Sequence, residues 1–213
     1  MSLAWWVGLG LFLLTPWLPA ADSADRAAWE RSLTELRVGR DLLDAKFKFL
    51  YWAEQDLDAQ EPVRQEYNKT VEKLADDLQQ GGESATRLSN RATNLMWRLF
   101  RETKPMLDAR PGQMTDMKKR YEIVEPIVRL SLEMARVKYR NTVETGQSTG
   151  DLQASIEFAA EKIALAQKLA GEGNYRSAMR SLSEAVPPSD KAIVGLPRNS
   201  AGIKNFQFNA GRD

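Results

Sequence analysis

Apolar residues recur at helical spacing through most of the chain, and the pattern is clearest in residues 25–58. Leucines stand at positions seven residues apart there, namely Leu36, Leu43, Leu50 and Leu57. A seven-residue repeat places such side chains on one stripe of an α-helix. The pattern therefore predicts a long amphipathic helix that packs through this stripe.

The second half of this helix is rich in aromatic residues, namely Phe47, Phe49, Tyr51 and Trp52. Side chains at successive positions point in different directions around a helix, so some of these rings must face away from the leucine stripe. Either a second layer of the protein covers them or a partner does. Phe49 and Trp52 are therefore candidate partner contacts.

The same periodicity predicts further helices over residues 62–80, 84–104, 115–145, 151–170 and 175–186. Pro126 lies inside the fourth helix and is expected to kink or split it near Glu125, because proline removes a backbone donor. The pair Pro187 and Pro188 is expected to stop the sixth. Short connections favour antiparallel neighbours. The predicted fold is an all-α antiparallel bundle of about six helices in residues 24–188.

Residues 189–213 form a predicted irregular C-terminal tail, which contains Gly195, Gly202 and Gly211. The tail also carries apolar residues, and Phe206 and Phe208 would share one side of an extended strand. It could dock on the bundle or add to the edge of a partner's sheet. Phe206 and Phe208 are the second pair of candidate partner contacts.

The first residues, Met1 to Ala21, carry no charged side chain. Prolines and small residues follow the apolar run, which is the layout of an export signal. We expect residues 1–23 to be a signal peptide or, in the alternative, an uncleaved anchor that contacts the membrane through residues 1–18. Both interpretations predict a periplasmic or secreted location for the rest of the chain.

The composition removes several classes of function. The 213 residues contain 30 Lys and Arg, 29 Asp and Glu, no His and no Cys. Binding of nucleic acid requires a basic face on the protein, and the balanced charge of this chain does not indicate one. Without His and Cys the chain lacks a histidine triad, the usual zinc sites, thiol catalysis and disulfides. We therefore predict a protein without a cofactor and without enzymatic activity.

Carboxylate chemistry is the alternative that remains. Glu122 and Glu125 share a helix face, and so do Glu157 and Glu161. If the two pairs faced each other, four carboxylates could bind a metal ion or act as acid and base. Whether they converge cannot be read from the sequence, since exposed glutamates also pair routinely with Lys or Arg on helices.

The last two helices contain a recognisable set of small and apolar residues: Leu165, Ala166, Gly173, Asn174, Tyr175, Ala178, Leu182 and Ala185. This segment, about residues 159–188, resembles a single tetratricopeptide repeat. It departs from that pattern at Lys162, where a large apolar residue is usual, and at Pro187, which comes early. Any tight antiparallel hairpin with alanine contacts would explain the same residues.

These observations predict an exported, non-enzymatic helical protein that binds another protein as a scaffold, adaptor or accessory subunit. The expected contacts are Phe49, Trp52, Phe206 and Phe208. Three alternatives stay open: a membrane-anchored subunit of a larger assembly, a bundle that binds a small molecule or metal, and a carboxylate-dependent enzyme.

Overall fold

The computed structural model describes residues 23–108 and 116–207 of the chain. The described residues form six α-helices and no strand: α1 (Ser23–Trp52), α2 (Glu61–Gln79), α3 (Ala85–Asp108), α4 (Met117–Glu144), α5 (Leu152–Gly171) and α6 (Tyr175–Gly195). This confirms the predicted all-α bundle. The predicted leader, residues 1–23, lies outside the described residues except for its last residue, Ser23.

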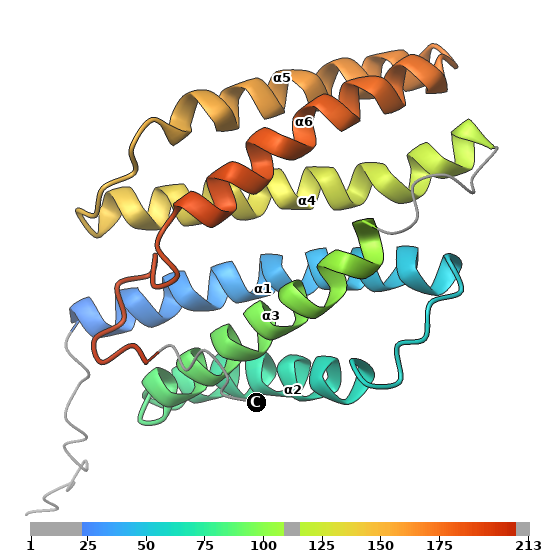
Figure 1. Cartoon of the computed structure of the whole chain (residues 1–213). Helices are drawn as coiled ribbons and strands as arrows, with labels where there is room; N and C mark the ends of the chain where they lie inside the picture. Colours follow the sequence, from blue (N-terminus) through green and yellow to red (C-terminus); the bar gives the residue numbers. More distant parts are fainter. Residues whose placement is uncertain (1–22, 109–115, 208–213) are drawn as a thin grey trace, which may run out of the picture.

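Two helices, α1 and α4, pack side by side in the middle of the molecule (Figure 1). The α2–α3 pair covers α1 on one side, while α5 and α6 form a closely packed hairpin on α4. None of the helices in the described ranges combines the length and apolarity needed to cross a bilayer. The bundle is thus two helical layers joined through α1 and α4.

The leucine stripe of α1 forms the centre of the core, as its spacing predicted. Leu36, Leu43 and Leu50 are fully buried, and Leu57 is buried just after the helix. Tyr67 of α2 is also buried and donates its hydroxyl hydrogen to the carbonyl of Leu36. Burial, and then the nearby Glu35 carboxylate, raise the pKa of Tyr67 well above its ordinary value, so the phenol stays neutral in the core.

Two predicted helix ends, at residues 104 and 186, each just before a proline, are wrong. α3 continues through Pro105 to Asp108, and α6 continues through Pro187 and Pro188 to Gly195. A proline inside a helix loses one hydrogen bond and costs about 3 kcal/mol. In α6 the next turns bury Ser189, Ala192 and Ile193, and this tertiary packing offsets the local penalty.

Pro126 likewise lies inside a continuous helix. α4 runs from Met117 to Glu144 and is not split at Glu125. Its start is fixed by Asp116, whose carboxylate accepts hydrogen bonds from the backbone of Lys118 at 3.0 Å and Lys119 at 3.2 Å. This is an N-cap, which satisfies helix donors that have no partner in the first turn.

The described part of the C-terminal tail docks on the bundle rather than extending as a strand. Ala201 and Ile203 are buried against Ala28 and Trp29 near the start of α1. The amide nitrogen of Asn90 on α3 reaches the carbonyl oxygen of Asn205 at 3.4 Å. The tail therefore connects the first turns of α1 to α3.

Candidate functional site

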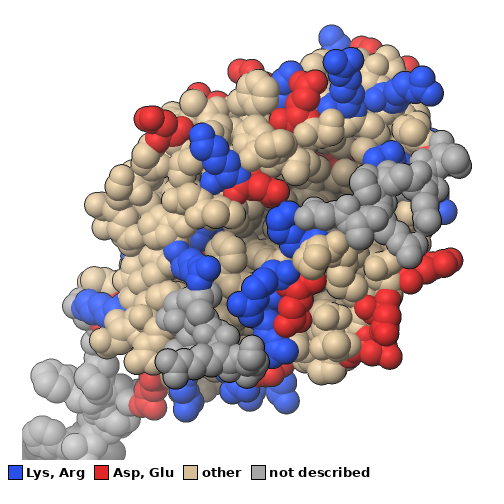
Figure 2. Space-filling model, viewed as in Figure 1, with Lys and Arg blue, Asp and Glu red and all other residues tan. Residues whose placement is uncertain are grey.

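A cleft of about 1150 Å³ opens between α3 and α6. It exists because, within the described residues, α3 packs on α1 and α2 but not on α4 or α6. The floor is formed by α1 and α4, which do pack on each other. Figure 2 shows the molecule from the side on which α3 and α6 lie in Figure 1. We call this feature the α3–α6 cleft.

The floor of the α3–α6 cleft is apolar. Its lining side chains come from α1 and α4 and include Leu42, Phe49, Val124, Ile127 and Val128. α6 contributes Met179, Leu182 and Ile193 to the adjoining wall. A concave, mainly apolar surface with a few polar groups is the usual character of a binding site in proteins.

The edge of the cleft on α6 is an exposed apolar surface. Val186 is 37% exposed and Val194 is 77% exposed, and both line the cleft. They are eight positions apart, so they share one face of α6 with Asp190 between them. We refer to Val186 and Val194 as the apolar lip.

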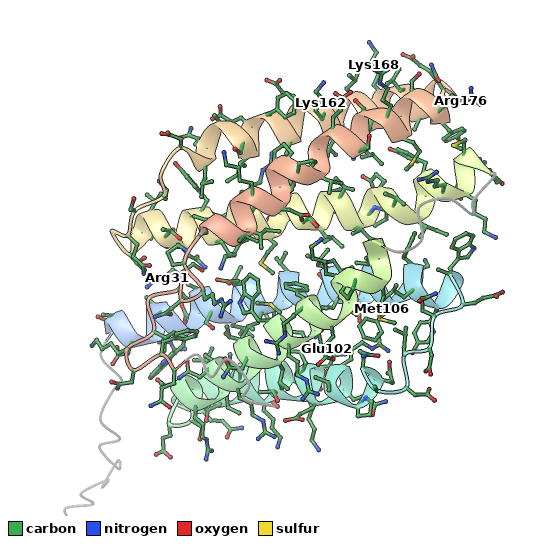
Figure 3. All side chains as sticks on the ribbon, in the orientation of Figure 1. Arg31, Glu102, Met106, Lys162, Lys168 and Arg176 are labelled. Carbon is green, nitrogen blue, oxygen red and sulfur yellow. The ribbon has the colours of Figure 1, made fainter. Side chains whose placement is uncertain are left out.

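The opposite edge, on α3, is basic. Arg98, Arg101 and Lys104 follow one another at three-residue steps and line the cleft, so they lie along one side of the helix. Glu102 on the same helix accepts a hydrogen bond from Arg98 Nε at 2.7 Å and is labelled in Figure 3. We refer to Arg98, Arg101 and Lys104 as the basic lip.

Three further cations complete the lining: Lys46 of α1, Arg120 of α4 and Arg198 of the tail. The cleft thus gathers six Lys or Arg side chains against two carboxylates, Glu102 and Asp190. The whole chain carries a formal charge of only +1. The lining of this apolar cleft therefore carries an excess of positive charge, which can steer an anionic partner.

Trp97 lies in the cleft next to the basic lip. Its ring has two cations over it, Lys138 Nζ at 5.2 Å from the centroid and the Arg198 guanidinium at 5.7 Å. The indole Nε1 is buried without a hydrogen-bond partner among the described residues. In folded proteins such a donor is usually satisfied by water or by a bound group, so Trp97 is a natural reporter of binding in the cleft.

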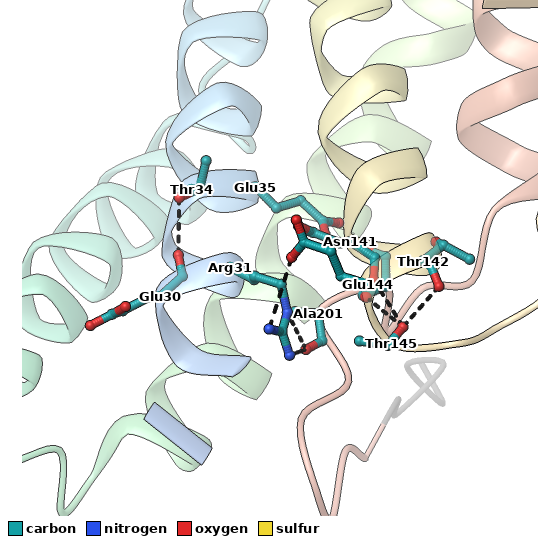
Figure 4. A network of polar contacts seen from close by, with 10 residues as sticks. Glu30, Arg31, Thr34, Glu35, Asn141, Thr142, Glu144, Thr145 and Ala201 are labelled. Carbon is teal, nitrogen blue, oxygen red and sulfur yellow. Dashed lines mark hydrogen bonds and ion pairs between the residues drawn. The ribbon is translucent and has the colours of Figure 1, made fainter. Parts of the chain in front are cut away.

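A buried polar cluster stands beside Trp97 and consists of Glu35, Lys138, Asn141 and Ser200. Lys138 is fully buried, and its Nζ lies 3.4 Å from Glu35 Oε1. The other carboxylate oxygen of Glu35 accepts hydrogen bonds from Ser200 Oγ and, at 3.4 Å, from Asn141 Nδ2. Figure 4 shows Glu35 of α1 facing Asn141 of α4. Within the cluster the buried charges of Glu35 and Lys138 compensate each other.

The same cluster fixes the tail. Lys138 Nζ donates to the carbonyl of Pro197 at 2.7 Å. Arg31 of α1 donates to the carbonyl of Ala201 at 3.1 Å and lies 4.0 Å from the Glu144 carboxylate (Figure 4). Because Arg198 lies between these two attachment points, the cluster determines where that cation stands in the cleft.

The predicted partner contacts fall in different places. Phe49 is 8% exposed, lies on the cleft floor and packs with Trp52 at a ring separation of 6.3 Å. Trp52 is half-buried at the end of α1 and outside the cleft lining. Phe206 is half-buried in the tail, between Asn205 and Gln207, whose carbonyl oxygens accept hydrogen bonds from Asn90 and Asn94 of α3, and Phe208 lies outside the described residues. Phe49 and Trp52 thus lie at the end of α1, whereas the described part of the tail lies against the first half of α3 and the start of α1.

The glutamate pairs are not brought together either. Glu122 pairs with Lys118 at 3.9 Å, and Glu125 pairs with Arg129 at 3.4 Å. Glu157 accepts a hydrogen bond from Gln153 at 2.8 Å on its own helix. Among the described residues no group of three metal-ligating side chains gathers. The four-carboxylate site considered from the sequence is therefore not formed.

A polar group fastens α2 to the aromatic end of α1. Arg64 donates to Glu61 at 2.9 Å and to Asp44 at 3.0 Å, and Tyr51 donates to Glu61 at 3.0 Å. The hydrogen bonds from Arg64, and then from Tyr51, lower the pKa of Glu61 below its ordinary value. The charged form of this carboxylate is thus favoured in the folded protein.

The lowered pKa of Glu61 gives a prediction on pH and stability. A depressed folded pKa contributes stability above the unfolded pKa, and the contribution is lost as the pH falls through the folded value. We expect Glu61→Gln to lower the free energy of unfolding by up to about 1 kcal/mol at neutral pH and to have no such effect in acid. Denaturant unfolding across this pH range measures the difference. Glu72→Gln, an exposed position on the same helix, should show no pH-dependent difference, and a difference for Glu61→Gln that grows in acid would contradict the assignment.

Sequence reasoning missed the cleft and the buried polar cluster. A signal for the basic lip was present in the three-residue spacing of Arg98, Arg101 and Lys104. Lys138 stands in the same row as Ser131, Ala135 and Thr142 of α4, all of which are buried. A charged residue within a buried row indicates a buried partner, although the sequence does not say which one.

Comparison with known proteins gives no relative: the chain matches no family model, no curated protein and no solved structure. The resemblance of residues 159–188 to a tetratricopeptide repeat therefore stays a prediction. The structure does show these residues as a tight helical hairpin, in which Ala159, Ala166, Ala178 and Ala185 are buried.

Proposed function

We propose that the protein is an exported, non-enzymatic binding protein and that the α3–α6 cleft is the surface that holds a partner protein. The observation that carries this proposal is the open cleft itself, with an apolar floor and a Val194 side chain that is 77% exposed. Exposed apolar residues that adjoin a concave surface are typical of interaction sites. At about 1150 Å³ the cleft is large for a small-molecule pocket and has room for a segment of a macromolecule.

The chemistry of the lining supports binding rather than catalysis. The cleft supplies apolar area, aromatic rings and fixed cations, which give affinity and orientation. Glu102 is engaged by Arg98 at 2.7 Å, so this carboxylate is held in a salt bridge instead of being poised as a general base. The predicted export segment, residues 1–23, supports a location beyond the membrane in either of its two interpretations.

Site-directed photo-crosslinking in the cells that make the protein tests the proposal. A photoreactive amino acid at Val194 should form an adduct with one defined protein, which mass spectrometry identifies. The matched control is Val143, which is 54% exposed on α4 and outside the cleft lining, and it should give no such adduct. Equal labelling from both positions, or none from Val194, would refute the proposal.

Binding of the purified partner then distinguishes a functional contact from a chance neighbour. Val186→Asp places a charge on the apolar lip and should weaken binding at least about tenfold, since it buries an unpaired carboxylate in the interface. Val143→Asp should leave affinity unchanged. Equal affinities for the two variants would show that the captured protein does not use the cleft.

A membrane-anchored subunit of a larger assembly is the second candidate, and it is favoured by the uncharged run Met1 to Ala21. In this case residues 1–18 stay in the bilayer and the cleft faces the other subunits. Fractionation with intact-mass measurement separates the two. A full-length mass that needs detergent for extraction supports the anchor, and a mass reduced by about twenty residues supports the signal peptide.

A further inference from the structure

We infer that the segment held in the α3–α6 cleft is an amphipathic helix with an acidic face, supplied by the partner protein. This inference rests on the proposed function, namely that the cleft binds a protein. It is carried by the distribution of charge and apolar surface along the two lips and by the length of the cleft.

The length of the cleft fits a short helix. On α3 its lining runs from Asn94 to Leu107, and on α6 it runs from Met179 to Val194. At a rise of 1.5 Å per residue these stretches are each roughly 20 Å long. An α-helix of about 14 residues covers the same distance, and it would lie along α3 and α6 over a floor already lined by apolar side chains of α1 and α4.

The two lips differ in character, and this difference sets the orientation of such a helix. Val186 and Val194 form an apolar lip, with the Asp190 carboxylate between them. Arg98, Arg101 and Lys104 form the basic lip on the other side. A partner helix can place its apolar stripe on the floor and the apolar lip, while its acidic face meets α3.

The spread of cations favours an extended acidic surface over a single acidic head group. From Arg98 to Lys104 the basic lip extends about 9 Å along α3, and Lys46, Arg120 and Arg198 surround it from three other elements. A fatty acid carries one carboxylate and could engage only one part of this array. Carboxylates at successive turns of a helix could meet several of these cations at once.

Synthetic peptides test the inference directly. Three 14-residue peptides share one apolar stripe and differ only in the adjoining face, which carries Glu, Gln or Lys. Titration into the full-length protein, followed by calorimetry and by tryptophan fluorescence, should rank their affinities as Glu, then Gln, then Lys. We expect the Glu and Lys peptides to differ at least about tenfold, with a difference that shrinks as salt is added.

Charge reversal on the protein provides the matched comparison. Arg101→Glu with Lys104→Glu should invert the ranking, so that the Lys peptide binds more tightly than the Glu peptide. Arg136→Glu with Arg140→Glu makes the same change at exposed positions of α4 outside the cleft and should leave the ranking as it is. An unaltered ranking in the α3 variant would overturn the inference.

The remaining outcomes separate this inference from the proposed function. Equal binding of the Glu and Lys peptides would overturn the acidic partner while leaving a protein-binding cleft. If no peptide binds but the protein captured at Val194 does, the occupant is not an acidic helix, and only the inference fails. Saturable binding of oleate that quenches tryptophan fluorescence in the wild-type protein but not in a Trp97→Phe variant, with no peptide bound and no adduct at Val194, would overturn both.

Discussion

Replacing Lys138 with methionine is expected to lower the free energy of unfolding by about 3–5 kcal/mol. Lys138 is fully buried, and its ammonium group is the positive partner of the buried Glu35 carboxylate. Methionine preserves most of the volume but leaves that carboxylate with only neutral donors, Asn141 and Ser200. The carbonyl of Pro197 also loses its donor. Urea unfolding followed by circular dichroism measures the loss.

The double variant Glu35→Gln with Lys138→Met is the control for this result. It removes both charges together, and the glutamine amide can still bond to Ser200 and Asn141. Removing a buried pair as a unit costs much less than removing one partner, because no uncompensated charge remains. The double variant should therefore recover most of the stability lost in Lys138→Met. A double variant as unstable as the single one would show that Glu35 does not carry the effect.

The same substitution has a local consequence at the cleft. Lys138 holds the tail through Pro197 and stands over the ring of Trp97 together with Arg198. Loss of the lysine frees one end of the segment that carries Arg198, so part of the basic surface around the cleft loses its fixed position. The stability of the core and the shape of the candidate site are thus coupled through one buried cation.

The sequence was sufficient to predict the helices and the central stripe of α1. Leu36, Leu43 and Leu50 repeat at a period that only a helix can use to bury all of them on one side. Helix ends at proline were predicted less well. The free-energy cost of placing Pro187 and Pro188 in a helix can be read from the local sequence. The burial of Ala192 and Ile193 beyond them depends on contacts with other helices, which the neighbouring residues do not reveal.

The candidate site could not be predicted for a related reason. Glu35 meets Lys138 across 103 residues and Ser200 across 165 residues, so no local spacing relates them. The cleft arises because, in the described part of the chain, α3 packs on α1 and α2 but on neither α4 nor α6. Periodicity identifies the apolar face of each helix but does not show which face stays open after assembly. Exposed Val194 was therefore indistinguishable from a core valine in the sequence.

We predicted partner binding from aromatic residues, whereas the cleft that we propose as the binding site is lined largely by aliphatic and basic ones. Phe49 does line the cleft, but it is nearly buried in the floor and mainly serves the core. Trp52 is engaged with Phe49 and has Lys119 over its ring at 5.8 Å. Aromatic side chains on an amphipathic helix are more often covered by the fold itself, and here the fold covers most of them.

Substitution of Gly39 by alanine is expected to destabilise the protein by about 1–3 kcal/mol, even though alanine is the better helix former by roughly 1 kcal/mol. Gly39 lies in α1 where side chains from three other helices converge. A Cβ atom there would overlap the sulfur of Met96 and come within 3.0 Å of Tyr67 Oη and 3.1 Å of Met134 Cε. All three of these residues are fully buried, so none can move aside into solvent.

The control is the same substitution at Gly171, in the last turn of α5, where an added Cβ would meet no atom within 4 Å. Gly171→Ala should be neutral or stabilising by up to about 1 kcal/mol, because alanine reduces the entropy of the unfolded chain. Gly39→Val should lower the free energy of unfolding more than Gly39→Ala, because the two methyl groups of valine need space that other side chains already occupy.

Tryptophan emission gives a second measurement. Met96 is adjacent to Trp97, so the displaced sulfur should also change the tryptophan emission of the folded Gly39→Ala protein. If both alanine variants unfold at the wild-type denaturant concentration, α1 does not approach α2, α3 and α4 as closely as the structure shows.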